Sequence, residues 1–311
     1  MDLDQLANDR FDETDIRHRL TGMLSDIFLN TAQKGFSVSA RDIAALREAR
    51  DASAALVTDY FDRMIGLAEE RRRNLPLFCG IRFVSLGEDC FARTVLARWG
   101  VRGFSGIGDR SGPFDLAVHP LASVTELIGN GFDGYMDPAN LAFRPERNIC
   151  VNTRYDVKFN HEADERFAAE DFGLLRSTYA RRMAVLDEIM RDPAPVVLVA
   201  HTKTPARALD APLLALWEAI GRRWGTQGRI LLGLDTWPGA NNDRAAGVRQ
   251  IAPQVTAFAI PRPGADYTWH RPRACFSPEG EAFERRVVDF VKHAAQAAFA
   301  PAGVREAEPV G

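Results

Sequence analysis

The chain has 311 residues, of which 46% are hydrophobic and 26% charged, so it is long enough to bury a full core in one large domain or two smaller ones. Its net charge is −3 and no stripe of basic residues stands out, which argues against nucleic-acid binding. The first residues lack the basic and apolar segments of a signal peptide, and no apolar stretch approaches the roughly 18 residues that a membrane-spanning helix needs. We therefore expect a cytoplasmic globular protein that does not act at a membrane.

Residues 1–76 are predicted to form a helical extension. Apolar residues recur at helical spacing from Ile43 to Leu56, and a second stripe continues through Met64. The charge run Glu69–Arg73 follows and is typical of a solvated helix end. We expect the extension to close at Pro76.

Residues 77–300 alternate short apolar runs with helical patterns. The runs that we expect to be strands are 81–86, 196–200, 230–234 and 255–260. Three of them are almost continuously apolar, as strands buried on both faces are. The helical patterns between or after these strands cover 91–99, 121–128, 174–190, 211–224 and 278–299. This alternation predicts an α/β domain with a mostly parallel sheet flanked by helices.

Two stretches depart from that alternation. Residues 130–172 are rich in Asn, Asp, Arg and Pro and contain one strand-like segment, Tyr155–Phe159, so we interpret them as an inserted, loop-rich region near the active edge of the sheet. Residues 301–311 are predicted to form a disordered tail.

The four cysteines lie far apart, at positions 79, 90, 150 and 275. None belongs to a Cys-x-x-Cys pair or has a histidine at metal-ligand spacing, so no metal site is expected. In a reducing compartment such cysteines are usually buried as small hydrophobic residues. No cofactor is expected either, because the first strand is followed by Gly-Glu-Asp-Cys rather than Gly-x-Gly-x-x-Gly and no Walker loop occurs.

Cys90 differs from the other cysteines because it follows the strand 81–86 and begins the helix 91–99. At a helix N-terminus, free backbone N–H groups and the helix dipole favour a thiolate, which is the nucleophilic form of cysteine. Glu88 or Asp89 could cap the helix, and their negative charge would oppose that effect. These residues alone leave a nucleophilic and a structural role for Cys90 equally open.

A cysteine nucleophile needs a base, and two of the six histidines end predicted strands. His201 follows the strand 196–200 at its carboxyl end, where ligands gather in an open α/β sheet. His161 ends the strand-like segment that begins at Tyr155. Chemistry alone ranks these two histidines equally, and a structural role is the alternative for each. The others are expected on helix surfaces or in loops, namely His18, His119, His270 and His293.

The tetrad Gly112-Pro-Phe-Asp115 has the composition of a turn in which Asp115 caps the following helix. Asp115 could also orient a histidine or bind substrate, and the two roles are compatible.

Several of these motifs, taken in order, resemble a bacterial family of uncharacterised proteins described as putative papain-like cysteine peptidases. The family opens with Ser-Leu-Gly-x-x-Cys, and this chain has Ser85-Leu-Gly-Glu-Asp-Cys90. The motifs that follow are similar in Arg102, in Ser111-Gly-Pro-Phe-Asp115, in Tyr155-Asp-Val-Lys-Phe-Asn-His161 and in Ser177-Thr-Tyr-Ala-Arg-Arg182. The resemblance covers roughly residues 81–200. Leu116 and Glu162 depart from the tryptophan and aspartate that the family has there.

The resemblance implies a cysteine-dependent hydrolase or acyl transferase with Cys90 as nucleophile and His161 as general base. Asp115 is our choice for a third catalytic residue, ahead of Glu162 and Asp164. Substrate contacts are expected from Gly87, Arg102, Ser111 and His201, with Arg110 as a further candidate for an anionic group. The substrate would be a peptide, an ester or a glycan-linked acyl group.

Two other functions remain open from the sequence. The loops that carry His201, Asp235, Trp237 and Trp269 could form a non-catalytic binding module for a sugar or nucleotide-sugar. An esterase-like enzyme could instead use His201 or Asp235, with Cys90 structural. A papain fold would pack the cysteine helix on an antiparallel sheet, whereas the strand pattern predicts a parallel one, and we expect the parallel architecture.

Overall fold

The computed structural model describes residues 55–103, 109–203, 209–239, 246–265 and 267–299. In chain order, the elements up to the insertion are α4 (Ala55–Phe78), β1 (Arg82–Gly87), α5 (Phe91–Arg98) and α6 (Leu121–Gly129). The insertion holds β2 (Leu141–Arg144), β3 (Ile149–Asn152) and β4 (Val157–Ala163), and α7 (Ala169–Arg191) begins at its end. The remaining elements are β5 (Val196–Thr202), α8 (Asp210–Trp224), β6 (Arg229–Pro238), β7 (Gly247–Ala252), β8 (Val255–Arg262), α9 (Pro272–Cys275) and α10 (Pro278–Phe299).

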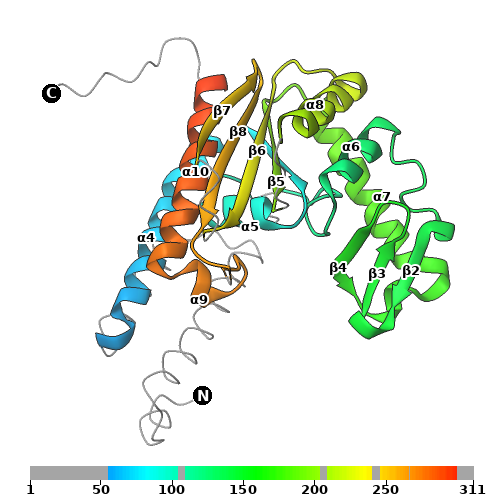
Figure 1. Cartoon of the computed structure of the whole chain (residues 1–311), viewed down its shortest axis with the longest axis horizontal. Helices are drawn as coiled ribbons and strands as arrows, with labels where there is room; N and C mark the ends of the chain where they lie inside the picture. The colour runs from blue at the N-terminus through cyan, green and yellow to red at the C-terminus, as the bar shows by residue number, and fades with distance from the viewer. Residues whose placement is uncertain (1–54, 104–108, 204–208, 240–245, 266, 300–311) are drawn as a thin grey trace, which may run out of the picture.

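A five-stranded sheet with the order β1-β5-β6-β8-β7 forms the centre of the molecule (Figure 1). The first four strands of that order are parallel, and only β7 runs antiparallel, beside β8. β5 is buried at every position, because it lies between two strands and is covered on both faces. The predicted mostly parallel sheet is therefore confirmed, and each of the four predicted strands is present.

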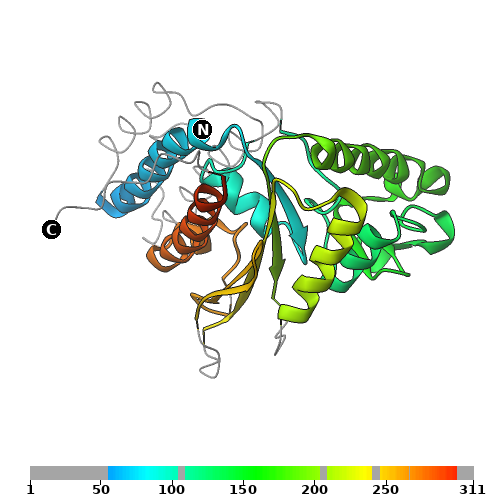
Figure 2. The same cartoon turned by 90° about the horizontal axis from the view of Figure 1, so that it is seen from above.

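Helices cover both faces of this sheet, and Figure 2 shows α10 on one side and α8 on the other. One core joins α4, α5 and α10 to the sheet and includes Val95, Trp99 and Val288. The other core joins α6, α7 and α8 to the opposite face and includes Leu127 and Leu216. Successive side chains along β1 and β5 point to opposite faces of the sheet, so neighbouring residues belong to different cores.

The insertion is more regular than the sequence predicts. It contains a three-stranded antiparallel sheet with the order β2-β3-β4. Two of the strands, β2 and β3, are only four residues long. Turn residues flank them, and one of these, Asn148, has the left-handed conformation. Such short strands carry no periodic signal of their own, so pairing between them decides their structure.

α4 is more closely packed than a solvated extension would be. Arg71, in the predicted solvated charge run, is fully buried, and the helix continues through Pro76 to Phe78. Asn74 donates a hydrogen bond to the carbonyl of Trp99. The predicted helix before residue 55 and the predicted tail at 301–311 lie outside the described residues. In the part of the chain that the structure describes, no helix is both long and apolar enough to cross a membrane.

Candidate active site around Cys90

Cys90 lies at the carboxyl edge of the parallel sheet, between β1 and α5. It is the N-cap residue of α5, and its carbonyl accepts the first helical hydrogen bond, from the Thr94 amide. The residue is partly exposed, whereas Cys150 and Cys275 are buried and Cys79 is exposed. The predicted strand–loop–helix around Cys90 is thus present. A glycine is also required at position 87, at the end of β1, because a Cβ there would lie 2.4 Å from the His201 carbonyl oxygen on β5.

Asp89 anchors the loop that carries Cys90. One of its carboxylate oxygens accepts hydrogen bonds from the Phe91 amide, at 2.9 Å, and from His201 Nδ1, at 2.8 Å. The other lies 2.7 Å from Lys203 Nζ. Burial alone would raise the pKa of Asp89, but the charges and hydrogen bonds of His201 and Lys203 outweigh it and lower the pKa. Asp89 is therefore an anion held directly beside the thiol.

The surroundings of Cys90 favour the neutral thiol in the free protein. Burial raises its pKa above the ordinary value, and the charge of Asp89 acts in the same direction. Interactions with the side chains of Trp269 and Thr94 act against these effects without cancelling them. A helix N-terminus alone does not make this cysteine acidic, because the capping anion opposes the helix dipole.

The Trp269 loop is held against α5 by a buried ion pair. Arg98 Nη1 lies 2.5 Å from Glu284 Oε1 on α10, and Arg98 also donates to the Trp269 carbonyl. The indole N–H of Trp99 and the hydroxyl of Tyr267 donate to the same Glu284 carboxylate. The last residue of α5 therefore fixes the loop that carries Trp269, and Trp269 packs in the same core against which Cys90 lies at the start of the helix.

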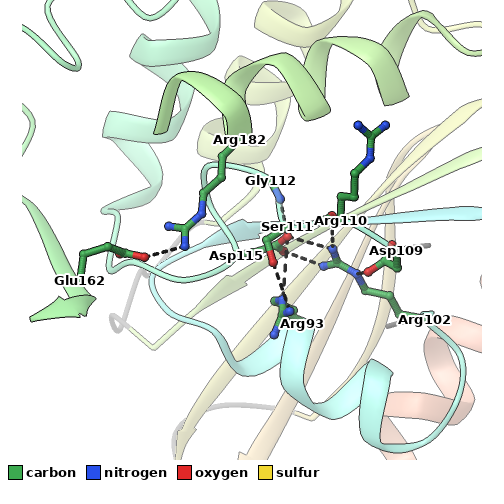
Figure 3. Close-up of polar contacts among 9 residues, drawn as sticks. All are labelled: Arg93, Arg102, Asp109, Arg110, Ser111, Gly112, Asp115, Glu162 and Arg182. Atoms are coloured by element: carbon green, nitrogen blue, oxygen red, sulfur yellow. Dashed lines mark hydrogen bonds and ion pairs between the residues drawn. The ribbon is translucent and has the colours of Figure 1, made fainter. Parts of the chain in front are cut away.

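The Gly112-Pro-Phe-Asp115 segment forms a second anchored loop, shown in Figure 3. Arg102 donates to both oxygens of Asp115, at 2.6 and 2.8 Å, and its Nε donates to Asp109. The Gly112 amide also donates to Asp115, at 2.7 Å. Burial would raise the pKa of Asp115, but Arg102 above all lowers it. Asp115 is thus bound to an arginine and not to a histidine, and the buried Arg102 directs four of its five N–H donors at this loop.

Arg93 is a residue near the thiol that the sequence interpretation did not select. It lies in the first turn of α5, three residues after Cys90, and it donates to Ser111 Oγ at 3.2 Å. Its Nε is 4.0 Å from Asp115. Figure 3 shows the guanidinium groups of Arg93 and Arg102 both facing Asp115. The spacing of three residues from Cys90 is the signal that could have identified it.

His161 lies on β4 and is exposed, while its neighbour Glu162 points into the protein. The surrounding protein partly desolvates the ring and so lowers the pKa of His161. The negative charge of Glu162 acts to raise this pKa, and the positive charges of Arg93 and Arg182 act to lower it. His161 is therefore neutral near pH 7 and able to accept a proton. Glu162 pairs with Arg182 and accepts from Tyr179. Across the described residues, no hydrogen bond joins Cys90 to His161 or to His201.

The groups considered for the two other functions are buried. His201 is 1% exposed, and its Nε2 lies 3.0 Å from Thr236 Oγ1, so both ring nitrogens are engaged. Asp235, Trp237 and Trp269 are buried as well. His270, next to Trp269, is exposed, and its pKa is lowered by partial burial and by nearby cations.

Arg110 lies at the surface in an ion pair with Glu188. No group of three or more His, Cys, Asp or Glu side chains within the described ranges could hold a metal ion.

Comparison with known proteins gives one match. A family model with the description putative papain-like cysteine peptidase (DUF1796) matches residues 81–225, which confirms the family resemblance for this segment. The match spans somewhat less than half of the chain and includes Cys90, Asp115, His161 and His201, but not the Trp269 loop. No curated protein and no solved structure matches the chain.

Proposed function

We propose that the protein is a cysteine-dependent hydrolase or acyl transferase in which Cys90 is the nucleophile and His161 the general base. The observation that carries the proposal is the position of Cys90, partly exposed at the start of α5 on the carboxyl edge of the parallel sheet. The matching family model, whose description names a cysteine peptidase, supports the same kind of chemistry.

The chemistry needs a base, because the pKa of Cys90 is raised. As the sulfur attacks a carbonyl carbon, His161 takes the thiol proton and a tetrahedral oxyanion forms. First-turn amides of α5 would hold that oxyanion; the Phe91 amide already binds Asp89, which leaves those of Ala92 and Arg93. His161 returns the proton to the leaving amine or alcohol, and a thioester remains on Cys90. Water, or an acceptor in a transferase, then releases the acyl group.

The proposal is tested with fluorogenic peptides and p-nitrophenyl esters between pH 6 and 9. We expect Cys90→Ser to abolish turnover and His161→Ala to reduce it by about 10²- to 10⁴-fold. His270→Ala is the matched control, because His270 is also exposed and follows Trp269. Full activity of Cys90→Ser on a substrate that the protein cleaves would overturn the proposal. A loss with His270→Ala but not with His161→Ala would reassign the base.

The geometry does not favour a carbohydrate-binding module or an esterase based on His201 or Asp235, since those side chains are buried and His201 is engaged at both nitrogens.

A further inference from the structure

Arg93 has hydrogen-bond donors that the described part of the protein does not use. Its Nε is buried without a hydrogen-bond partner there, and among the described residues the Arg93 side chain makes one hydrogen bond, from Nη2 to Ser111 Oγ. The side chain as a whole is 26% exposed, so Arg93 lies at the border between the buried loop and solvent. A buried donor without an acceptor is costly, and a bound acceptor would remove that cost.

The nearest carboxylate does not meet this need. Asp115 lies 4.0 Å from Arg93 Nε, and both of its oxygens already accept shorter bonds from Arg102. The Gly112 amide takes a further bond to Asp115. Asp115 therefore balances the charge of Arg93 but does not accept a hydrogen bond from its Nε, which stays available to another acceptor.

Arg93 also lies where a substrate of Cys90 would be bound. The two residues are three apart at the start of α5, which places them on the same side of the helix. The charge of Cys90 as a thiolate acts on Arg93, and the charge of Arg93 acts on His161. The guanidinium group thus shares a helix face with Cys90 and acts electrostatically on His161.

We propose that Arg93 binds a carboxylate of the substrate one helical turn from Cys90, so that the protein acts on acyl compounds carrying a carboxylate near the scissile carbonyl. This inference rests on the proposed function. A guanidinium group matches a carboxylate geometrically, through two parallel N–H···O bonds. A phosphate would bring up to two negative charges toward a loop that already holds Asp109 and Asp115, whose charges are paired with the single buried cation Arg102. A single carboxylate fits that balance better.

The test compares alkylation of Cys90 by iodoacetate, which carries a carboxylate, with alkylation by neutral iodoacetamide. All proteins carry Cys79→Ser, because Cys79 is exposed, and the labelled residue is identified by peptide mass. At pH 8.5 we expect the ratio of the iodoacetate rate to the iodoacetamide rate to fall about tenfold or more in Arg93→Gln. Arg93→Lys should be intermediate, since it keeps the charge but not the planar donors. Arg222→Gln, which removes an exposed arginine from α8, should keep the original ratio.

Titration calorimetry with succinate gives a second measurement that does not depend on the thiol. We expect Arg93→Gln to bind succinate about tenfold more weakly than the unchanged protein. An unchanged alkylation ratio together with equal or absent succinate binding overturns the inference and leaves the proposed function standing. Tighter binding of inorganic phosphate than of succinate overturns the carboxylate assignment. If Cys90 reacts with neither reagent, the proposed function fails, and the inference that rests on it fails with it.

Discussion

At the scale of single residues, the reactivity of Cys90 depends on the balance between a helix terminus and its capping anion. Asp89 fixes the first turn of α5 through the Phe91 amide, and His201 and Lys203 hold Asp89 in its charged form. The cap that orders the loop therefore also raises the pKa of the thiol beside it. Such a cysteine differs from one kept as a resting thiolate, and its activation must come with substrate or base.

This balance predicts the pH dependence of thiol labelling. Because the pKa of Cys90 lies above its ordinary value, the thiol predominates at neutral pH, and the iodoacetamide rate should keep rising beyond pH 9. Asp89→Asn removes a negative charge that disfavours the thiolate, so the midpoint should fall by about one pH unit. The measurement is the pseudo-first-order labelling rate against pH in Cys79→Ser protein. A midpoint that stays in place or moves upward in Asp89→Asn would contradict this account of the site.

At the scale of elements, α5 couples the thiol to the Trp269 loop. Its first turn carries Cys90 and Arg93, and its last residue, Arg98, is paired with Glu284 of α10 in a fully buried contact. Desolvation of the two charges is costly, and their mutual attraction offsets that cost only while both are present.

The losses of stability caused by removing the two partners separately should therefore not add up when both are removed. We expect Glu284→Gln to reduce the free energy of unfolding by about 3–5 kcal/mol, because Arg98 would remain buried without its counter-charge. The double variant Arg98→Met/Glu284→Leu should lose less than the sum of Arg98→Met and Glu284→Leu. Urea unfolding followed by circular dichroism measures these values. Additive losses would show that the pair is not energetically coupled.

The sequence is informative about elements to different degrees. Long periodic segments such as α8 and the apolar strand β5 could be predicted closely, because their pattern reflects burial in the sheet. In α7, regular helical geometry is absent at Glu170–Phe172, which agrees with the predicted start near residue 174. The pairing of Arg102 with Asp115 could not be predicted, since it depends on how a loop folds back on the end of α5.

At the scale of the whole molecule, the packing of α4 decides whether this helix is part of the α/β domain or a separate extension. Met64 and Leu67 lie in the same core as Trp99 and Val288, so this helix shares its apolar face with α5 and α10. Gly100 permits the close approach, because a Cβ there would lie 2.5 Å from the Arg71 carbonyl oxygen.

Two substitutions on this one helix separate the alternatives. Met64 is fully buried, so Met64→Ala should lower the free energy of unfolding by about 2–5 kcal/mol through lost contacts and the cavity left behind. Leu77 is 65% exposed on the same helix, and Leu77→Ala should change the free energy of unfolding by no more than about 0.5 kcal/mol. Urea unfolding is followed by tryptophan fluorescence, whose five tryptophans, Trp99 among them, all lie outside α4, and by circular dichroism. Coincident transitions that shift together in Met64→Ala mean that α4 unfolds with the domain that carries Cys90, whereas an early transition seen by circular dichroism alone would mean that it unfolds separately.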